Sequence, residues 1–207
     1  RDVERATAMI ANLLDSLGLP AGARVAVQTE KSVEALLLYL AVLRAGYVYL
    51  PPNTAYQAAE IEYFIGNAEP AVVVCSGRNF GWISKLAFKA GTRHVFTLDD
   101  DRSGTLLERT AFHADTHEPV RCRSDDLAAI LYTSGTTGRS KGGMLTHGNV
   151  LSNARVLKDY WGWVKGDVLL HVLPIFHVHG LFVASHGALL NGSKMIWFAR
   201  FDPAAVV

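Results

Sequence analysis

The chain alternates short apolar runs rich in β-branched residues with longer stretches in which apolar residues recur at helical spacing. The short runs predict strands at residues 24–28, 47–51, 71–75, 94–98, 127–133, 168–172 and 194–198. The longer stretches predict helices at residues 3–17, 33–44, 57–67, 80–90, 148–160 and 181–190, with a weak helix around Leu106 in the polar segment 99–117. Because strands that alternate with helices form parallel sheets with helices on both faces, the pattern predicts an α/β fold.

The polar region near residues 100–125 is the expected boundary between two α/β halves. We expect residues 1–117 to form the first half and residues 118–207 to begin the second. The chain starts at Arg1 without a charged leader, and Asp202 and Pro203 look like the cap and first residue of a new helix. We therefore expect both ends to have been cut from a longer protein.

Charge and composition exclude several classes of partner. The formal net charge is +1, which gives no indication of a nucleic-acid partner. The most apolar helical stretch, residues 33–43, contains Glu34 and is far shorter than the roughly 20 residues of a membrane span, so no membrane insertion is expected. Cys75 and Cys122 cannot form a disulfide framework, which favours a reducing compartment and a cytoplasmic protein.

The segment "LYTSGTTGRSKGGMLTH", Leu131 to His147, directly follows the predicted strand 127–133. In parallel α/β folds, ligands bind beyond the carboxyl ends of the strands. The glycines of this segment allow the backbone to approach a ligand and to point successive N–H groups at an anion. Its hydroxyl side chains add donors, and Arg139 and Lys141 add positive charge. The combination suits a polyphosphate.

This segment has two other interpretations. The P-loop pattern fails twice, because Ser140 stands where its second glycine belongs and Gly142 where it has Ser or Thr. A plain Gly/Ser/Thr surface loop is the remaining alternative.

Three segments together resemble the adenylate-forming enzymes, the superfamily of acyl-CoA synthetases, nonribosomal adenylation domains and luciferases. "YTSGTTGRSKG" resembles their phosphate-binding signature, "LRAGYVYLPPN" their second core block, and "LPIFHVHGL" the block beside the acyl pocket. Within the family, "QTEKSVEALLLYLAVLRAG" and "IFHVHGLFVAS" are most similar to bacterial malonyl-CoA synthetases. The resemblance implies the partial N-terminal domain of an adenylate-forming enzyme, with parallel sheets flanked by helices.

The resemblance also implies an activity in two steps. The family attacks the α-phosphorus of ATP with a carboxylate, which gives an acyl-adenylate, and a thiol such as coenzyme A then displaces AMP. It implies that the β- and γ-phosphates are bound by Thr133, Ser134, Gly135, Thr136, Thr137, Gly138 and Lys141, with Lys141 also catalytic. The blocks that hold adenine, ribose and Mg²⁺, and the C-terminal lid with its lysine, are expected beyond Val207, so this piece alone is expected to be a poor catalyst.

His177 and His179 lie beside Gly180, just after the predicted strand 168–172. By resemblance, His177 is a catalytic residue at the boundary between the acyl and thiol channels, and His177 and His179 line the acyl pocket. An imidazole can hydrogen-bond to the unreacted carboxylate of a dicarboxylic acid. Ser185 is expected to extend this polar lining.

The histidines also have other candidate roles. His177 and His179 could form half of a metal site, but no third ligand is identifiable by spacing, so no metal site is expected here. Purely structural histidines are the other alternative, and His186 could join the polar lining or be structural. His171 and His147 are expected to be structural.

The sequence thus predicts the amino-terminal part of an ATP-dependent acyl-CoA synthetase, with malonate as the favoured acid. Two alternatives stay open: a synthetase for another carboxylic acid, such as acetate, a medium-chain acid or an aryl acid, and a nucleotide-binding module without catalysis.

Overall fold

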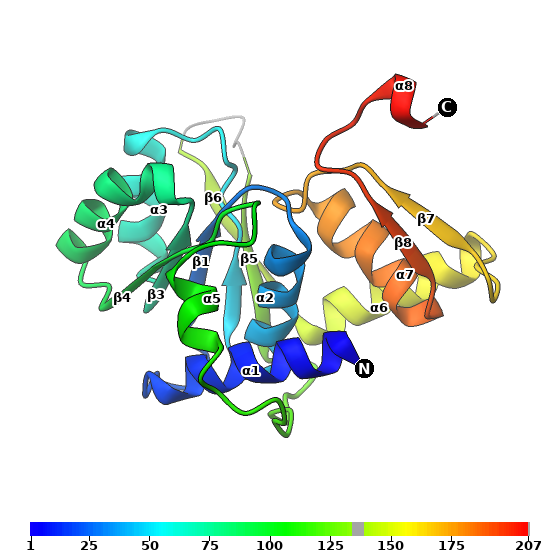
Figure 1. Ribbon diagram of the computed structural model, residues 1–207, viewed down its shortest axis with the longest axis horizontal. Helices are drawn as coiled ribbons and strands as arrows, with labels where there is room; N and C mark the ends of the chain where they lie inside the picture. The colour runs from blue at the N-terminus through cyan, green and yellow to red at the C-terminus, as the bar shows by residue number, and fades with distance from the viewer. Residues whose placement is uncertain (134–138, 207) are drawn as a thin grey trace.

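Two sheets form the framework of the protein in the computed structural model, which describes residues 1–133 and 139–206 (Figure 1). The larger sheet has the order β4-β3-β1-β2-β5-β6, and the smaller pairs β7 with β8. The strands are β1 (Arg24–Gln28), β2 (Val48–Leu50), β3 (Val72–Cys75), β4 (His94–Thr97), β5 (Leu127–Thr133), β6 (Lys141–Thr146), β7 (Val168–His171) and β8 (Lys194–Trp197). The described ladders are all parallel except the one between β5 and β6.

Helices cover both faces of the larger sheet, with α1, α2 and α5 on one face and α3 and α4 on the other (Figure 1). The helices are α1 (Asp2–Ser16), α2 (Val33–Arg44), α3 (Ala58–Ala68), the 3₁₀ turn η1 (Gly77–Asn79), α4 (Phe80–Lys89), α5 (Thr105–Thr110), α6 (His147–Tyr160), the π-helix η2 (His179–Ser185), α7 (His186–Asn191) and α8 (Pro203–Val206). None of the described helices is long and apolar enough to span a bilayer.

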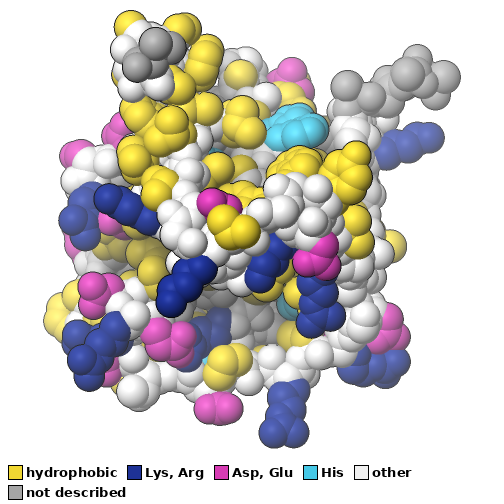
Figure 2. Space-filling view, turned by 90° about the vertical axis from the view of Figure 1, so that its right-hand side faces the viewer, with side chains coloured by type: hydrophobic (Ala, Val, Ile, Leu, Met, Phe, Trp, Pro, Cys, Tyr) yellow, Lys and Arg dark blue, Asp and Glu magenta, His cyan; other side chains and the backbone are white. Residues whose placement is uncertain are grey.

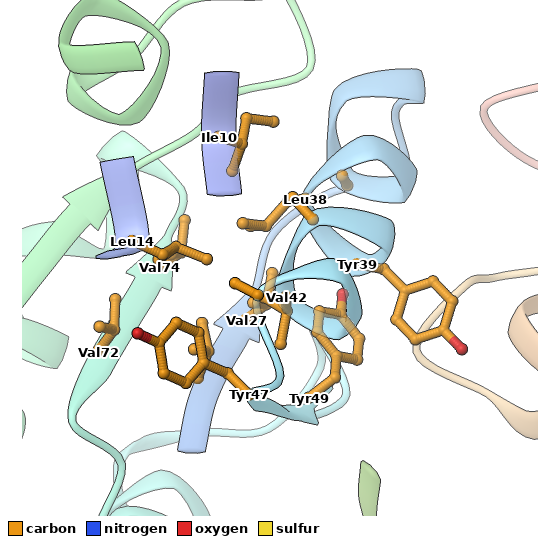
Figure 3. Close-up of a cluster of buried hydrophobic side chains, with 14 of the residues drawn as sticks. Ile10, Leu14, Val27, Leu38, Tyr39, Val42, Tyr47, Tyr49, Val72 and Val74 are labelled. Atoms are coloured by element: carbon orange, nitrogen blue, oxygen red, sulfur yellow. The ribbon is translucent and has the colours of Figure 1, made fainter. Parts of the chain in front are cut away.

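Side chains alternate across the central strands, so that each strand contributes to both layers of the core. Val25 and Val27 pack into the cluster under α1 and α2, whereas Ala26 packs into the cluster under α3 and α4. This period of two is the geometry of a strand covered on both faces. Figure 3 shows the first of these clusters, where Leu38 and Val42 of α2 point towards the strands.

The predicted α/β fold is confirmed. Each expected strand, and each expected helix except the one at residues 181–190, is present within a few residues of its predicted bounds. Helix α5 lies around Leu106 as expected, and α8 begins at Pro203, where Asp202 Oδ1 accepts a hydrogen bond from Ala204 N at 3.0 Å.

Two elements differ from the sequence prediction. Residues 141–146 form the antiparallel strand β6 rather than loop, because their pairing with β5 outweighs the low strand propensity of Gly142 and Gly143. The single helix expected at residues 181–190 is instead the π-helix η2 followed by α7.

The division between the sheets lies later in the chain than the predicted boundary after residue 117. Strands β5 and β6 follow that boundary but pair within the larger sheet, because β5 lies beside β2 in the ladder Tyr49–Ala129. The second sheet begins only at Val168. The division of the chain into two halves, residues 1–117 and 118–207, stays a prediction.

Candidate functional site

Strand β5 ends at the carboxyl edge of the parallel sheet, where the predicted phosphate-binding segment starts. Thr133, the last residue of β5, pairs with Lys141, the first residue of β6, so the two side chains lie across one ladder step. Both residues are exposed. The other residues predicted to bind phosphates, Ser134, Gly135, Thr136, Thr137 and Gly138, lie outside the described residues. The structure thus places the two ends of the predicted segment together at the edge where α/β folds bind ligands.

Residues at the carboxyl-terminal end of this segment contact Tyr63, on helix α3. The Tyr63 hydroxyl donates a hydrogen bond to the carbonyl oxygen of Ser140 at 2.9 Å. The Arg139 guanidinium carbon lies 5.5 Å from the centroid of the Tyr63 ring, within the range of a cation–π contact. Nearby, the Tyr132 hydroxyl donates to Asn67 Oδ1 at 2.5 Å. Tyr63 carries no signal in the sequence, because a tyrosine on an amphipathic helix is ordinary packing.

The predicted histidine pair lies on the surface, after β7. The rings of His177 and His179 are stacked, with centroids 5.5 Å apart and an interplanar angle of 15°. The backbone N–H of His179 faces His177 Nδ1 at 3.4 Å, which orients the first ring against the second residue. Both side chains are exposed and available to a ligand. Figure 2, which views this side of the molecule, shows histidine side chains at the surface beside hydrophobic ones.

Ser185 is not on that surface. It is fully buried, its hydroxyl donates to the carbonyl oxygen of Gly180 at 2.8 Å, and it lies 3.0 Å from His171 Nε2. A hydroxyl with these protein partners does not line the exposed surface on which His177 and His179 lie.

Three other histidines of this region, His147, His171 and His186, are wholly or partly buried. His171 is 1% exposed, and burial, followed by the charge of Lys31, lowers its pKa. Burial also lowers the pKa of His147, at the start of α6. His186 shares a 2.8 Å hydrogen bond with the Tyr39 hydroxyl, and burial lowers its pKa to about 4. His186 therefore stays neutral near pH 7.

Lys31 connects the two sheets at their carboxyl edges. Its Nζ donates to the carbonyl oxygen of His171 at 2.6 Å and lies 4.6 Å from the centroid of the Trp197 ring. Burial lowers the pKa of Lys31 to about 8. A cavity of about 220 Å³ adjoins it, lined by Thr29, Glu30, Lys31, Thr54, residues 172–176 and residues 199–201. Sequence alone could not find this contact, which joins residues 140 positions apart.

Comparison with known proteins identifies the family. Residues 1–207 match the family described as AMP-binding enzyme. The chain belongs to the AMP-binding enzyme family. Its structure is similar to that of ATP-bound MatB from Rhodopseudomonas palustris, with a TM-score of 0.95 and 50% sequence identity. That match covers 99% of this chain and 40% of that chain.

Curated relatives in the AMP-binding family include ligases for dicarboxylic acids. The chain is 33% identical over 191 residues to the mitochondrial malonate–CoA ligase ACSF3 of Bos taurus, covering 88% of this chain and 30% of the relative. It is 32% identical over 196 residues to the oxalate–CoA ligase of Arabidopsis thaliana, covering 93% of this chain and 38% of the relative. The chain therefore spans well under half the length of these relatives.

Proposed function

We propose that this chain is the part of an ATP-dependent acyl-CoA synthetase that binds the phosphates of ATP and the carboxylic acid, and that the acid is malonate. The observation that carries the proposal is the likeness of almost the entire chain to ATP-bound MatB at 50% identity. The malonate–CoA ligases among the relatives support the choice of acid. The exposed, stacked imidazoles of His177 and His179 suit a substrate with a second carboxylate.

In the first step, a carboxylate oxygen of the acid attacks the α-phosphorus of ATP. A new P–O bond forms, the bond to the β-phosphate breaks, and pyrophosphate leaves with the electron pair. We assign Thr133, Ser134, Gly135, Thr136, Thr137, Gly138 and Lys141 to the β- and γ-phosphates. Donors and an ammonium group held in place stabilise the charge that builds up on the leaving pyrophosphate more than they stabilise the ground state.

In the second step, the thiol of coenzyme A attacks the carbonyl carbon of the acyl-adenylate. A C–S bond forms, the C–O bond to AMP breaks, and the thiol proton must be accepted. We assign His177 to the boundary between acid and thiol, where a neutral imidazole can accept that proton. Its exposure on the described surface supports this assignment.

For the acid, we assign the contact with the unreacted carboxylate to His179, together with His177. We propose that Ser185 affects binding of the acid only through the turn at Gly180. Its hydroxyl is buried and donates to the Gly180 carbonyl oxygen.

Mg²⁺ and a cytoplasmic location belong to the proposal as well. Among the described residues, no group of three or more His, Cys, Asp or Glu side chains could hold a metal ion, so we assign the Mg²⁺ ligands to ATP itself and to residues outside the described ranges. When bound, the ion would neutralise phosphate charge. Cys75 and Cys122 are both free thiols, in keeping with a reducing compartment.

A second candidate acid is oxalate, favoured by the similarity to the oxalate–CoA ligase of Arabidopsis thaliana. Oxalate is one carbon shorter than malonate, so its second carboxylate would need His179 to lie closer to the reacting carbon.

Acid-dependent exchange of labelled pyrophosphate into ATP tests the proposal in the full-length enzyme. Malonate, oxalate, acetate, a medium-chain acid and an aryl acid would be compared at equal concentration. We expect exchange to be fastest with malonate. Faster exchange with another acid would keep the reaction and change the substrate, and exchange with none of them would leave a nucleotide-binding module without this activity.

A further inference from the structure

The turn that carries His177 and His179 is bonded to β7 through a buried side chain. His171, the last residue of β7, places its Nε2 3.0 Å from the carbonyl oxygen of Gly180 and 3.0 Å from Ser185 Oγ. The Ser185 hydroxyl donates to the same carbonyl at 2.8 Å. The Gly180 carbonyl therefore accepts from two buried side chains, His171 before η2 and Ser185 at its last residue.

The protonation of His171 follows from these partners. A carbonyl oxygen only accepts hydrogen bonds, so Nε2 must carry the proton that is donated to Gly180. Within the described part of the chain, Nδ1 of His171 is buried and has no hydrogen-bond partner. An unpaired buried acceptor is less costly than an additional buried charge, so the ring is the neutral Nε2–H tautomer.

The backbone is closely packed at Gly180, whose carbonyl lies beside His171. A Cβ at Gly180 would stand 2.0 Å from the carbonyl oxygen of Pro174, so backbone runs against backbone there. One residue further, Leu181 N donates to the carbonyl oxygen of His177 at 3.0 Å. The first turn of η2 therefore fixes the backbone of His177. The contact of His179 N with His177 Nδ1 then fixes the orientation of the His177 ring beside that of His179. Single-turn π-helices are frequent at functional sites.

The other side of His171 is fixed as well. Its ring packs against Trp197 with centroids 4.5 Å apart, and its carbonyl oxygen accepts from Lys31 Nζ at 2.6 Å. His171, on β7, thus connects Trp197 of β8 and Lys31, in the segment after β1, to the first turn of η2.

We propose that His171 is a positioning residue for the acid site: its Nε2–H bond to Gly180 holds the start of η2 so that His177 and His179 present their imidazoles to the substrate as a stacked pair. Which substrate they meet rests on the proposed function, but the positioning itself does not.

The test uses three variants of the full-length enzyme. His171→Phe keeps a flat ring and removes the donor, His171→Gln restores an N–H at the reach of Nε2, and Ser185→Ala removes the second donor to Gly180. His113→Phe, on the segment after α5, is the control. The first readout is the ¹³Cε1–¹H NMR shift of His177 and His179, assigned with His177→Gln and His179→Gln, since stacked rings shift each other's signals. The second readout is the KM for malonate and for ATP in pyrophosphate exchange.

We expect His171→Phe to move both ring signals and to raise the KM for malonate at least about tenfold, because small displacements of catalytic groups are costly, while the KM for ATP changes less than about twofold. His171→Gln should recover most of both effects, and Ser185→Ala should show a smaller change of the same kind. Unmoved ring signals in His171→Phe, or a glutamine variant as impaired as the phenylalanine variant, would overturn the proposal. If His171→Phe does not fold, His171→Asn, whose shorter side chain does not reach the Gly180 carbonyl, takes its place, and unmoved ring signals in that variant overturn the proposal. If no acid supports exchange in the unmodified enzyme, the proposed function fails, and the NMR signals alone decide whether His171 positions the pair.

Discussion

The hydroxyl of Tyr39 and Nε2 of His186 share a 2.8 Å hydrogen bond, and their rings stack with centroids 5.7 Å apart at an interplanar angle of 22°. Tyr39 lies on α2, which covers the larger sheet, and His186 begins α7, beside the smaller one. Figure 3 shows the Tyr39 side chain pointing from α2 to the opposite side from Leu38 and Val42. This polar contact joins the layers of the two sheets.

The pKa of His186 predicts an acid-sensitive stability. Burial lowers the pKa from 6.5 to about 4, so between these values the unfolded chain binds a proton that the folded chain does not. The contribution is fully present above pH 6.5 and is lost as the pH falls through about 4, with an upper bound of about 3 kcal/mol for the full shift.

Urea unfolding at a series of pH values measures this effect. His186→Phe should flatten the fall in free energy of unfolding between pH 6.5 and 4 relative to the unmodified protein, because the titrating ring is gone. His113→Phe serves as control and should keep the original slope. An unchanged slope in the His186 variant would show that other groups carry the pH dependence.

A pair of glycine substitutions tests the packing around η2. Gly180→Ala would place a Cβ 2.0 Å from the Pro174 carbonyl oxygen, so it should lower the free energy of unfolding by about 3 kcal/mol. Gly66→Ala, on α3 with open space around the added carbon, should instead raise it by up to about 1 kcal/mol through helix propensity. Chemical denaturation compares the two. Equal, small effects would mean that the turn at Gly180 tolerates a side chain.

Sequence periodicity predicted most of the fold, because strands buried on both faces and amphipathic helices leave direct local signals. It missed β6, whose residues Gly142 and Gly143 carry no strand signal and whose pairing with β5 is a tertiary effect. The histidine pair and the segment predicted to bind phosphates stand out in the sequence because their residue types are chemically distinctive, and their roles stay predictions. The contacts from Tyr63 and Lys31 join residues 77 and 140 positions apart, so local patterns could not reveal them. His171 lies only nine positions from Gly180, but a lone histidine at the end of a strand does not show which group it bonds to.

Lys141→Ala and Thr137→Val should each slow the adenylation step. Removing one donor or charge aimed at the leaving phosphates costs about 10²-fold in rate when the group acts mainly in the transition state. Lys85→Ala, on the exposed face of α4, is the matched control and should leave the rate unchanged. Single-turnover formation of acyl-adenylate separates this step from thiol transfer. Rates close to the unmodified enzyme in both variants would remove the segment from the phosphate site.

His179→Ala should cause a selective loss for dicarboxylic acids. The imidazole is expected to hydrogen-bond to the unreacted carboxylate, so kcat/KM for malonate should fall about tenfold or more, while that for a monocarboxylic acid falls less than about twofold. Pyrophosphate exchange with malonate and with butyrate measures both. A loss of the same size for both acids would mean that His179 does not determine acid specificity.

The central claim is that Thr133 and Lys141, neighbours across the β5–β6 ladder, meet the phosphate tail of ATP. A crystal structure of the full-length enzyme with ATP tests it most directly, through the distances from Thr133 Oγ1 and Lys141 Nζ to the phosphate oxygens. We expect both atoms to lie within hydrogen-bond distance, about 3 Å, of the β- or γ-phosphate. A well-ordered ATP molecule bound elsewhere, with both side chains directed away from it, would contradict the account.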